Sequence, residues 1–207
     1  MSDRFATKQR MNLFQVFKNS GDHSGNNKRL NYCPNCGEKF AEKLLNKFER
    51  QQCEHCDFIN YLNPSPGITS IIRSPDGRVL IGKRSKNARY GNKWCLPGGY
   101  IEYEESFIET AHREILEETG LFVRIEGIVN VVSNNLDNLH HTIVVVLIGD
   151  VSGGFQEPND DLTELKWIDS AQHIGIHYAF EADKRIIDCY FAGNMKILPV
   201  DDSIEKR

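Results

Sequence analysis

Three glutamates near the middle of the chain have a spacing that suits the ligands of a divalent cation. Glu114, Glu117 and Glu118 stand at positions i, i+3 and i+4, so on a helix they share an arc of about 100°. Their like charges repel, and the repulsion grows where the helix is partly buried. Mg²⁺ or Mn²⁺ would resolve it, because a hard cation takes carboxylate oxygens and keeps waters for a phosphate and a nucleophile. The alternative is a solvated acidic face on which Arg113 pairs with Glu117.

Four of the six cysteines form a second constellation, two Cys-x-x-Cys pairs separated by sixteen residues. This pattern predicts one zinc ion in a closed tetrahedral site, and its ligands would be Cys33, Cys36, Cys53 and Cys56. A closed site leaves no position for substrate, and a segment this short needs the metal in order to fold. We therefore expect a structural zinc ribbon. Two alternatives are less favoured: a redox dithiol, which would not need two pairs, and a nucleic-acid-binding ribbon, because glutamates offset the lysines around this module.

The glutamates belong to a longer pattern that begins at Gly99 and ends at Leu121. It reads Gly-x5-Glu-x7-Arg-Glu-Ile-x-Glu-Glu-x-Gly-Leu and follows Trp-x-Leu-Pro-Gly-Gly. Every fixed position resembles the Nudix box, and the resemblance extends from about residue 64 to residue 192. It implies a Nudix hydrolase, in which metal-activated water attacks phosphorus and cleaves the pyrophosphate of a nucleoside diphosphate derivative.

The resemblance also implies roles for individual residues. The three helix glutamates would hold catalytic Mg²⁺ or Mn²⁺, joined by the carbonyl of Gly98. Glu105 would orient Arg113 or a metal-bound water, and Arg113 would hold the carboxylates in place. Relatives often add an acid from a later loop, for which Glu164 is the first candidate and Asp160 and Asp161 the next. The implied catalytic set is Glu105, Arg113, Glu114, Glu117, Glu118 and Glu164.

The segments around these residues predict the elements that position them. Strands are expected at 68–73, 79–83, 123–131, 141–150 and 164–168, and helices at 106–119 and 180–192. Residues 74–77 have the composition of a hairpin turn, and Gly120 that of a helix C-cap. Strands and helices mix without strict βαβ alternation, which favours an α+β domain in which helices sandwich a mixed sheet. The resemblance implies the Nudix α/β/α sandwich.

We expect three regions along the chain. Residues 1–30 read as a flexible tail, residues 31–61 as the zinc ribbon and residues 62–207 as the Nudix hydrolase domain. A zinc ribbon before a Nudix domain resembles NADH pyrophosphatases and a smaller group that hydrolyses FAD, ADP-ribose or nucleoside diphosphate sugars. NADH pyrophosphatases usually carry Ser-Gln-Pro after the box, where this chain has Asn-Val-Val-Ser-Asn-Asn-Leu at 130–136. This difference favours FAD, ADP-ribose or a similar substrate.

Two other functions compete with this one. The first is hydrolysis of NADH or of NAD-capped RNA. The second, of another class, is a Nudix-fold regulator that binds nucleic acid, although such proteins usually have degraded boxes and this box is intact. Candidate substrate contacts are Arg84, Tyr90, and His140 with its neighbour His141; the alternative for each is an ordinary surface arginine or a half-buried strand histidine.

Composition narrows the choice of partner. The 207 residues, 40% of them hydrophobic, can bury one core and a small appendage. The net charge is −4, and residues 1–30 carry +4, so the remaining −8 argues against nucleic acid. No apolar run approaches the roughly 20 residues that span a bilayer, and no signal peptide is evident, so a cytoplasmic enzyme of a small nucleotide substrate is expected. The family often dimerises, which makes a homodimer a further expectation.

Overall fold

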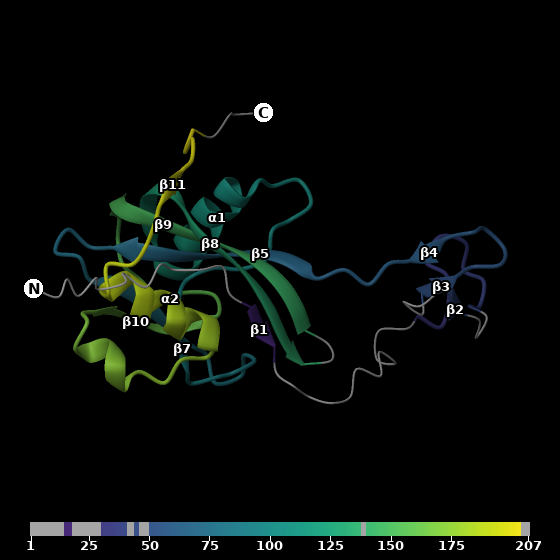
Figure 1. The fold of residues 1–207 in the computed structure, drawn as a ribbon, viewed down its shortest axis with the longest axis horizontal. Helices are drawn as coiled ribbons and strands as arrows, with labels where there is room; N and C mark the ends of the chain where they lie inside the picture. The colour runs from purple at the N-terminus through teal and green to yellow at the C-terminus, as the bar shows by residue number, and fades with distance from the viewer. Residues whose placement is uncertain (1–14, 18–29, 41–43, 46–49, 138–139, 204–207) are drawn as a thin grey trace, which may run out of the picture.

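The computed structural model of the chain describes residues 15–17, 30–40, 44–45, 50–137 and 140–203. A mixed eight-stranded sheet organises most of them, with the order β1-β8-β9-β5-β6-β10, β11 beside β8 and β7 beside β6 (Figure 1). The strands of this sheet are β1 (Gln15–Phe17), β5 (Ser65–Arg73), β6 (Val79–Arg84), β7 (Trp94–Cys95), β8 (Leu121–Asp137), β9 (His140–Gly154), β10 (Leu162–Ile168) and β11 (Leu198–Pro199). The helices are α1 (Phe107–Thr119), the 3₁₀ turn η2 (Gln172–Gly175) and α2 (Glu181–Phe191).

Parallel and antiparallel pairs are mixed in the sheet. β5 runs parallel to β9, whereas β8 and β9 form a long antiparallel hairpin. β5 and β6 are joined by the predicted turn, where the amide of Gly77 donates to the carbonyl of Ser74. Gly77 has φ of 81°, a conformation that favours glycine. The hairpin expected at residues 74–77 is therefore confirmed.

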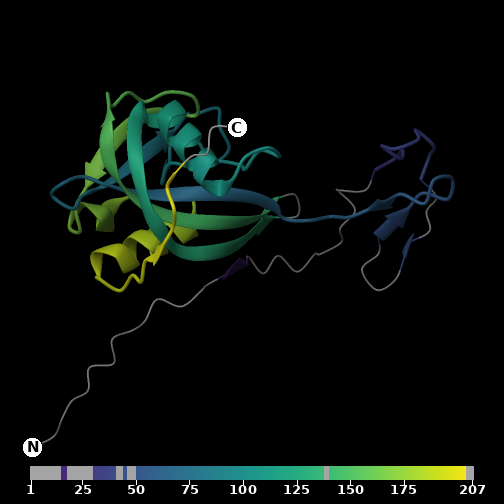
Figure 2. The same ribbon diagram turned by 90° about the horizontal axis from the view of Figure 1, so that it is seen from above.

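Alternate residues of the central strands face opposite layers. Ile71 packs in a cluster with Ile186 and other residues of α2, while its neighbour Ile72 packs with Ile115 and other residues of α1. The period of two in a strand sends successive side chains to opposite faces. Two views at right angles show α1 and α2 on the two sides of the sheet (Figures 1 and 2). The predicted α/β/α sandwich is confirmed.

Helix α1 begins and ends at sequence signals. The Ser106 side chain accepts from the amide of Glu109, whose carboxylate accepts from the amide of Ser106, which forms a capping box. Gly120 ends the helix with φ of 70°, and its amide donates to Leu116. A Cβ at Gly120 would overlap with the carbonyl of Phe155, so this position favours glycine for both reasons. The predicted helix and its cap are confirmed.

Strands β8 and β9 extend beyond the segments expected at 123–131 and 141–150. The added part of β8 contains the polar residues Ser133 and Asn134, and asparagine is depleted in strands. They nevertheless pair in register with Ile143 and Thr142 of β9. Pairing with β9 satisfies the backbone amides and carbonyls of this segment, and this outweighs its low intrinsic preference for a strand.

The N-terminal part contains a separate three-stranded sheet of β2 (Leu44–Leu45), β3 (Arg50–Gln52) and β4 (Ile59–Asn60). Gln15–Phe17 of the predicted tail form β1, and residues 1–14 and 18–29 lie outside the described residues. None of the helices in the described part of the chain is long and apolar enough to cross a membrane.

The capping box gives a prediction for stability. Ser106→Ala removes the acceptor for the amide of Glu109, and we expect it to lower the free energy of unfolding by about 1 kcal/mol. Urea denaturation followed by circular dichroism would measure the loss. Ser170→Ala, at an exposed serine outside the helices, is the control and should match the wild type. Equal loss in both variants would contradict the capping role.

Candidate active site and cysteine cluster

A pocket of about 460 Å³ contains many of the residues singled out above. On the side of α1 its lining includes Glu114, Glu118, Gly98, Gly99 and the loop residue Asp160. On the side of α2 the lining residues are mostly apolar, and the polar residues on this side include Asn134, Thr142 and Asp183. A pocket with one acidic side and one largely apolar side suits a ligand that is charged at one end.

Glu118 is the most buried of the acidic residues of α1, with 3% of its surface exposed. Its Oε2 accepts a hydrogen bond of 2.9 Å from the amide of Gly98. Burial raises the pKa of Glu118 to about 8, and the charges of Glu114 and Asp160 add to this rise. Burial also raises the pKa of Glu114. Carboxylates held together in this way are stabilised in their charged form by a bound cation.

Arg113 connects the other acidic residues around the helix. Its Nε and Nη2 donate to the two oxygens of Glu105 over 2.6 and 2.8 Å. Its Nη1 donates to Glu114 over 2.8 Å and to Glu117 over 3.1 Å. The hydrogen bonds with Arg113 hold the pKa of Glu105 at about 2, and those with Glu105 raise the pKa of Arg113. Arg113 therefore fixes the directions of three carboxylates without contacting Glu118.

Two glycines allow the backbone to approach these carboxylates. Gly98 has φ of 152°, and a Cβ on it would overlap with the carbonyl of Ile68. A Cβ on Gly99 would overlap with the carboxylate of Glu114. Glycine at both positions lets the chain pass directly against α1, so that the amide of Gly98 reaches Glu118.

The structure brings some of the predicted acids together and separates others. Glu117 is half exposed and does not line the pocket. Glu164 is also absent from the lining; it is exposed, pairs in register with Lys83 of β6, and lies 3.4 Å from the Lys83 ammonium. A register shift in β10 between Leu162 and Glu164 accompanies this placement. Of the later acids, the pocket lining contains Asp160 and Asp161 instead.

The three glutamates of the helix do not form one compact group of ligand atoms. Among the residues that the structure describes, ligand atoms that all lie within 4.8 Å of one another are found only in the group of four cysteines. Arg113 accounts for part of this separation, because it holds Glu114 and Glu117 by hydrogen bonds. A cation bound by all three carboxylates at once would therefore require rotation of at least one of these side chains.

Arg84 and Tyr90 both line the pocket, beside Phe180. Arg84 donates to the carbonyl of Arg89 over 2.9 Å and to Asp161 over 3.1 Å. Tyr90 has φ of 58°, and its ring lies edge-to-face with Phe180 at 5.4 Å. A tyrosine in the left-handed region is strained, a feature that clusters at functional sites.

Of the two predicted histidines, the structure describes the side chain of His141. His140 begins β9, and its side chain lies outside the described residues. His141 Nε2 lies 3.0 Å from Ser133 Oγ, and His141 does not line the pocket.

Asp183 and Asn134 are pocket residues that the sequence did not single out. Asp183 is 4% exposed and accepts a 3.0 Å hydrogen bond from the amide of Leu96. Burial raises its pKa to about 7. A signal was available: Asp183 precedes Ile186 and Ile187 by three and four residues, so it lies on the apolar face of the helix. Acidic residues are common in the first turn of a helix, however, so the position of Asp183 does not by itself indicate a buried carboxylate.

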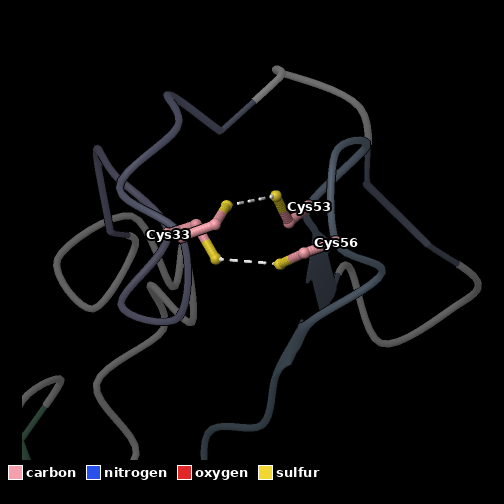
Figure 3. Close-up of side chains that lie close together, drawn as sticks. Cys33, Cys53 and Cys56 are labelled. Carbon is pink, nitrogen blue, oxygen red and sulfur yellow. Dashed lines mark hydrogen bonds between the residues drawn. The ribbon is translucent and has the colours of Figure 1, made fainter.

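The four cysteines form two matching turns. The amide of Gly37 donates to the carbonyl of Cys33, and that of Asp57 donates to the carbonyl of Cys53. Two sulfur pairs, Cys33 with Cys56 and Cys36 with Cys53, lie 3.6 and 3.5 Å apart. Figure 3 shows the side chains of Cys33, Cys53 and Cys56 directed at one another. A zinc tetrahedron with Zn–S bonds of about 2.3 Å has edges of about 3.8 Å, so the cysteines fit this metal.

One further contact in the cluster favours a thiolate. The side-chain amide of Asn35 donates to the sulfur of Cys56 over 3.4 Å and holds the pKa of Cys56 at about 6. Zinc binds the deprotonated form of cysteine.

Comparisons with known proteins agree with this architecture. The family described as NUDIX domain matches residues 63–189. A protein of Methanocaldococcus jannaschii named ADP-ribose pyrophosphatase is 33% identical over 134 residues, which are 64% of this chain and 75% of that protein. The NAD-capped RNA hydrolase NudC of Mannheimia succiniciproducens is 30% identical over 95 residues, which are 45% of this chain but 36% of that relative. A NUDIX hydrolase structure from Nitrosomonas europaea has a TM-score of 0.68 at 23% identity, covering 78% of this chain and 90% of its own, and shows the fold.

The burial of Asp183 gives a prediction for the pH dependence of stability. Its folded pKa of about 7 exceeds the ordinary value of 3.8, so between these pH values the unfolded chain binds fewer protons than the folded one. The free energy of unfolding therefore falls as pH rises through this window, and the variant Asp183→Asn has no group there to titrate. We expect Asp183→Asn to gain stability relative to the wild type between about pH 4 and pH 7. Urea titrations at several pH values would measure this, and a constant difference would contradict it.

Proposed function

This chain belongs to the NUDIX family and is a Nudix hydrolase, and we propose that its substrate is FAD, ADP-ribose or a similar nucleoside diphosphate derivative. The products would be a nucleoside monophosphate and the phosphorylated remainder. The observation that carries this proposal is Glu118, a buried carboxylate of the box that faces the same pocket as Glu114 and Asp160. The M. jannaschii relative supports the choice of substrate by its name.

We assign the divalent metal to the α1 side of the pocket. Glu114 and Glu118 would bind Mg²⁺ or Mn²⁺, with Glu117 joining after it leaves Arg113 and with the Gly98 carbonyl as a further ligand. Bound there, the metal would supply activation of the attacking water and charge neutralisation at the phosphate oxygens. Arg113 and Glu105 position these carboxylates. Asp160 replaces Glu164 as the preferred later acid, because Asp160 lines the pocket and its charge acts on both Glu114 and Glu118.

A second candidate substrate is supported by one comparison. The NudC relative is named for hydrolysis of NAD-capped RNA, and both reactions cleave the same kind of diphosphate. A small nucleotide remains the favoured partner because the body of the chain is acidic. A homodimer also remains a prediction.

The reaction test compares ADP-ribose, FAD, NADH and NAD-capped RNA in the presence of Mg²⁺ or Mn²⁺. We expect AMP and ribose 5-phosphate from ADP-ribose, or AMP and FMN from FAD. In ¹⁸O-labelled water the label should enter one phosphate product, because water attacks phosphorus. Glu118→Gln should lower kcat by about two to four orders of magnitude while the protein stays folded.

The matched control is Glu104→Gln, which neutralises an exposed glutamate just before the box helix. It should keep the wild-type kcat. Near-wild-type turnover by Glu118→Gln at limiting Mg²⁺ would remove the metal assignment, and absence of diphosphate cleavage with all four substrates would remove the proposed function.

The cysteine cluster gives a separate prediction, because we assign one structural zinc to it. Elemental analysis of protein purified without chelator should find about one zinc per chain. Cys36→Ser should lose that zinc and lower the melting temperature, since the short module depends on the metal to fold. Cys189→Ser, at a cysteine outside the cluster, should keep the zinc. Folded wild-type protein without zinc would overturn the assignment.

A further inference from the structure

The segment after α2 crosses from one layer of the fold to the other around the edge of the sheet. Ile197 packs against the core cluster on the α2 side, whereas Val200, three residues later, packs against the cluster on the α1 side. Between them, β11 pairs with β8, where Leu198 lies opposite Ile128. Both views show this segment running from α2 past β8 toward α1 (Figures 1 and 2). We call residues 197–203 the C-terminal strap.

The edge of β8 has a glycine where the strap crosses it. Gly127 lies opposite Pro199 in the register, and a Cβ on it would overlap with the carbonyl of Leu198. The amide of Val200 then donates to the carbonyl of Glu126 over 3.4 Å. Backbone pairing and the missing side chain therefore bring the end of the strap to a fixed place beside α1.

Asp202, near the end of the strap, bridges the sheet and the box helix with its two oxygens. Oδ2 accepts a hydrogen bond of 3.0 Å from the amide of Ile125 on β8, and Oδ1 lies 2.7 Å from Nε2 of His112 on α1. A carboxylate only accepts hydrogen bonds, so Nε2 carries the proton. The side chains of Asp202 and His112 are 22% and 23% exposed, so both ends of this contact are mostly shielded from water.

His112 and Glu118 flank the buried stripe of α1 from opposite sides. Six residues separate them, which places them about 120° apart around the helix axis. Ala111 and Ile115, both 0% exposed, lie within this arc and pack in the cluster on the α1 side of the sheet. One flank of α1 is therefore held by the hydrogen bond of Glu118 described above, and the other by that of His112 with Asp202.

These two hydrogen bonds restrict a motion of α1 that apolar packing leaves open. Burial of apolar surface is non-directional, so the stripe keeps α1 against the sheet without fixing its rotation about its own axis. Hydrogen bonds are directional. Side-chain tips lie about 5–6 Å from a helix axis, so a rotation of about 10° moves a carboxylate by about 1 Å. Mg²⁺ requires near-ideal octahedral geometry with oxygens at about 2.1 Å, so this displacement is large for a metal ligand.

We propose that Asp202 is a positioning residue of the active site, which sets the rotation of α1 through His112 and thereby the place of Glu118 beside the Gly98 amide. Asp202 does not line the pocket and acts through the helix. The strap thus connects the edge of the sheet to the metal side of the pocket. This inference rests on the proposed function in one respect, because the positioning serves the metal assigned to Glu114 and Glu118.

The test measures Mn²⁺ binding to the zinc-loaded full chain by electron paramagnetic resonance, with no substrate present. Asp202→Ala removes both acceptors, and we expect the affinity for Mn²⁺ to fall about tenfold, as is typical when groups that orient metal ligands are removed. His112→Ala should weaken Mn²⁺ binding in the same direction. Asp202→Asn should stay within about twofold of the wild type, because its oxygen can accept from Ile125 while its NH₂ group donates to the other tautomer of His112.

A second readout follows the same change without any metal. The amide of Gly98 donates to Glu118, so the chemical shift of its proton in nuclear magnetic resonance reports that hydrogen bond. This shift should change in Asp202→Ala and in His112→Ala, and should stay near the wild-type value in Asp202→Asn. In turnover of ADP-ribose, kcat should fall in Asp202→Ala while KM changes little, because the apolar side of the pocket is untouched.

Two control variants separate positioning from stability. Asp201→Ala changes the adjacent acid of the strap, which is exposed and accepts from the amide of Ser203. Ile168→Val leaves space in the core cluster on the α2 side and should lower the melting temperature. Both should keep the wild-type Mn²⁺ affinity and Gly98 shift. A purely structural role for Asp202 predicts that Asp202→Ala behaves like Ile168→Val.

The inference is overturned if folded Asp202→Ala keeps the Mn²⁺ affinity and the Gly98 shift of the wild type. If Asp202→Ala does not fold, His112→Ala decides by the same two measurements. If the wild type cleaves none of the diphosphates, the proposed function fails, but the Mn²⁺ affinity and the Gly98 shift still test Asp202. If the wild type binds no Mn²⁺ at α1, the metal assignment fails and the Gly98 shift alone decides whether Asp202 positions Glu118.

Discussion

The hydrogen bond from the Gly98 amide to the buried carboxylate of Glu118 is the contact on which the site depends. A carboxylate at this depth is strongly disfavoured in its charged form unless donors or cations compensate. The backbone supplies one donor, and it reaches Glu118 only because Gly98 and Gly99 have no side chains to collide with Ile68 and Glu114. The glycines and the glutamates of the box therefore form one structural unit. The backbone can lie against α1 only because the glycines have no side chains, and Glu118 has its backbone donor only because the chain lies there.

The sheet determines which residues can lie around these glycines and glutamates. Its two faces are each covered by one helix, so residues of α1 and α2 are separated by the strands between them. The pocket is lined from both helices, and this gives it an acidic side and a largely apolar side. A substrate that has a diphosphate at one end and an aromatic ring at the other matches this division. Different layers of the fold therefore supply the acidic side and the apolar side of the pocket.

Sequence patterns predicted the parts of the site that are local. The box glutamates, the glycines and the capping signals of α1 lie within about one helix of each other, and helical periodicity is sufficient to place them on one face. Asn134 and Asp183 could not be predicted in this way, because they are distant in sequence and line one pocket only after folding brings β8 and α2 together. The family resemblance favours Glu164 among the later acids, but the strand register places it beside Lys83, and register depends on pairing between strands that are distant in sequence.

The balance of charge around α1 explains why a cation is needed in addition to Arg113. The guanidinium contacts Glu105, Glu114 and Glu117, so its single positive charge is divided among three carboxylates. Glu118 lies outside that group and, like Glu114, is further affected by the charge of Asp160. The negative charge that Arg113 leaves uncompensated is thus concentrated at Glu118 and Asp160, which face the pocket beside Glu114. A solvated acidic helix would spread its charge into water, whereas this arrangement confines the charge beside a cavity, where a divalent ion would stabilise it and could bind a substrate phosphate at the same time.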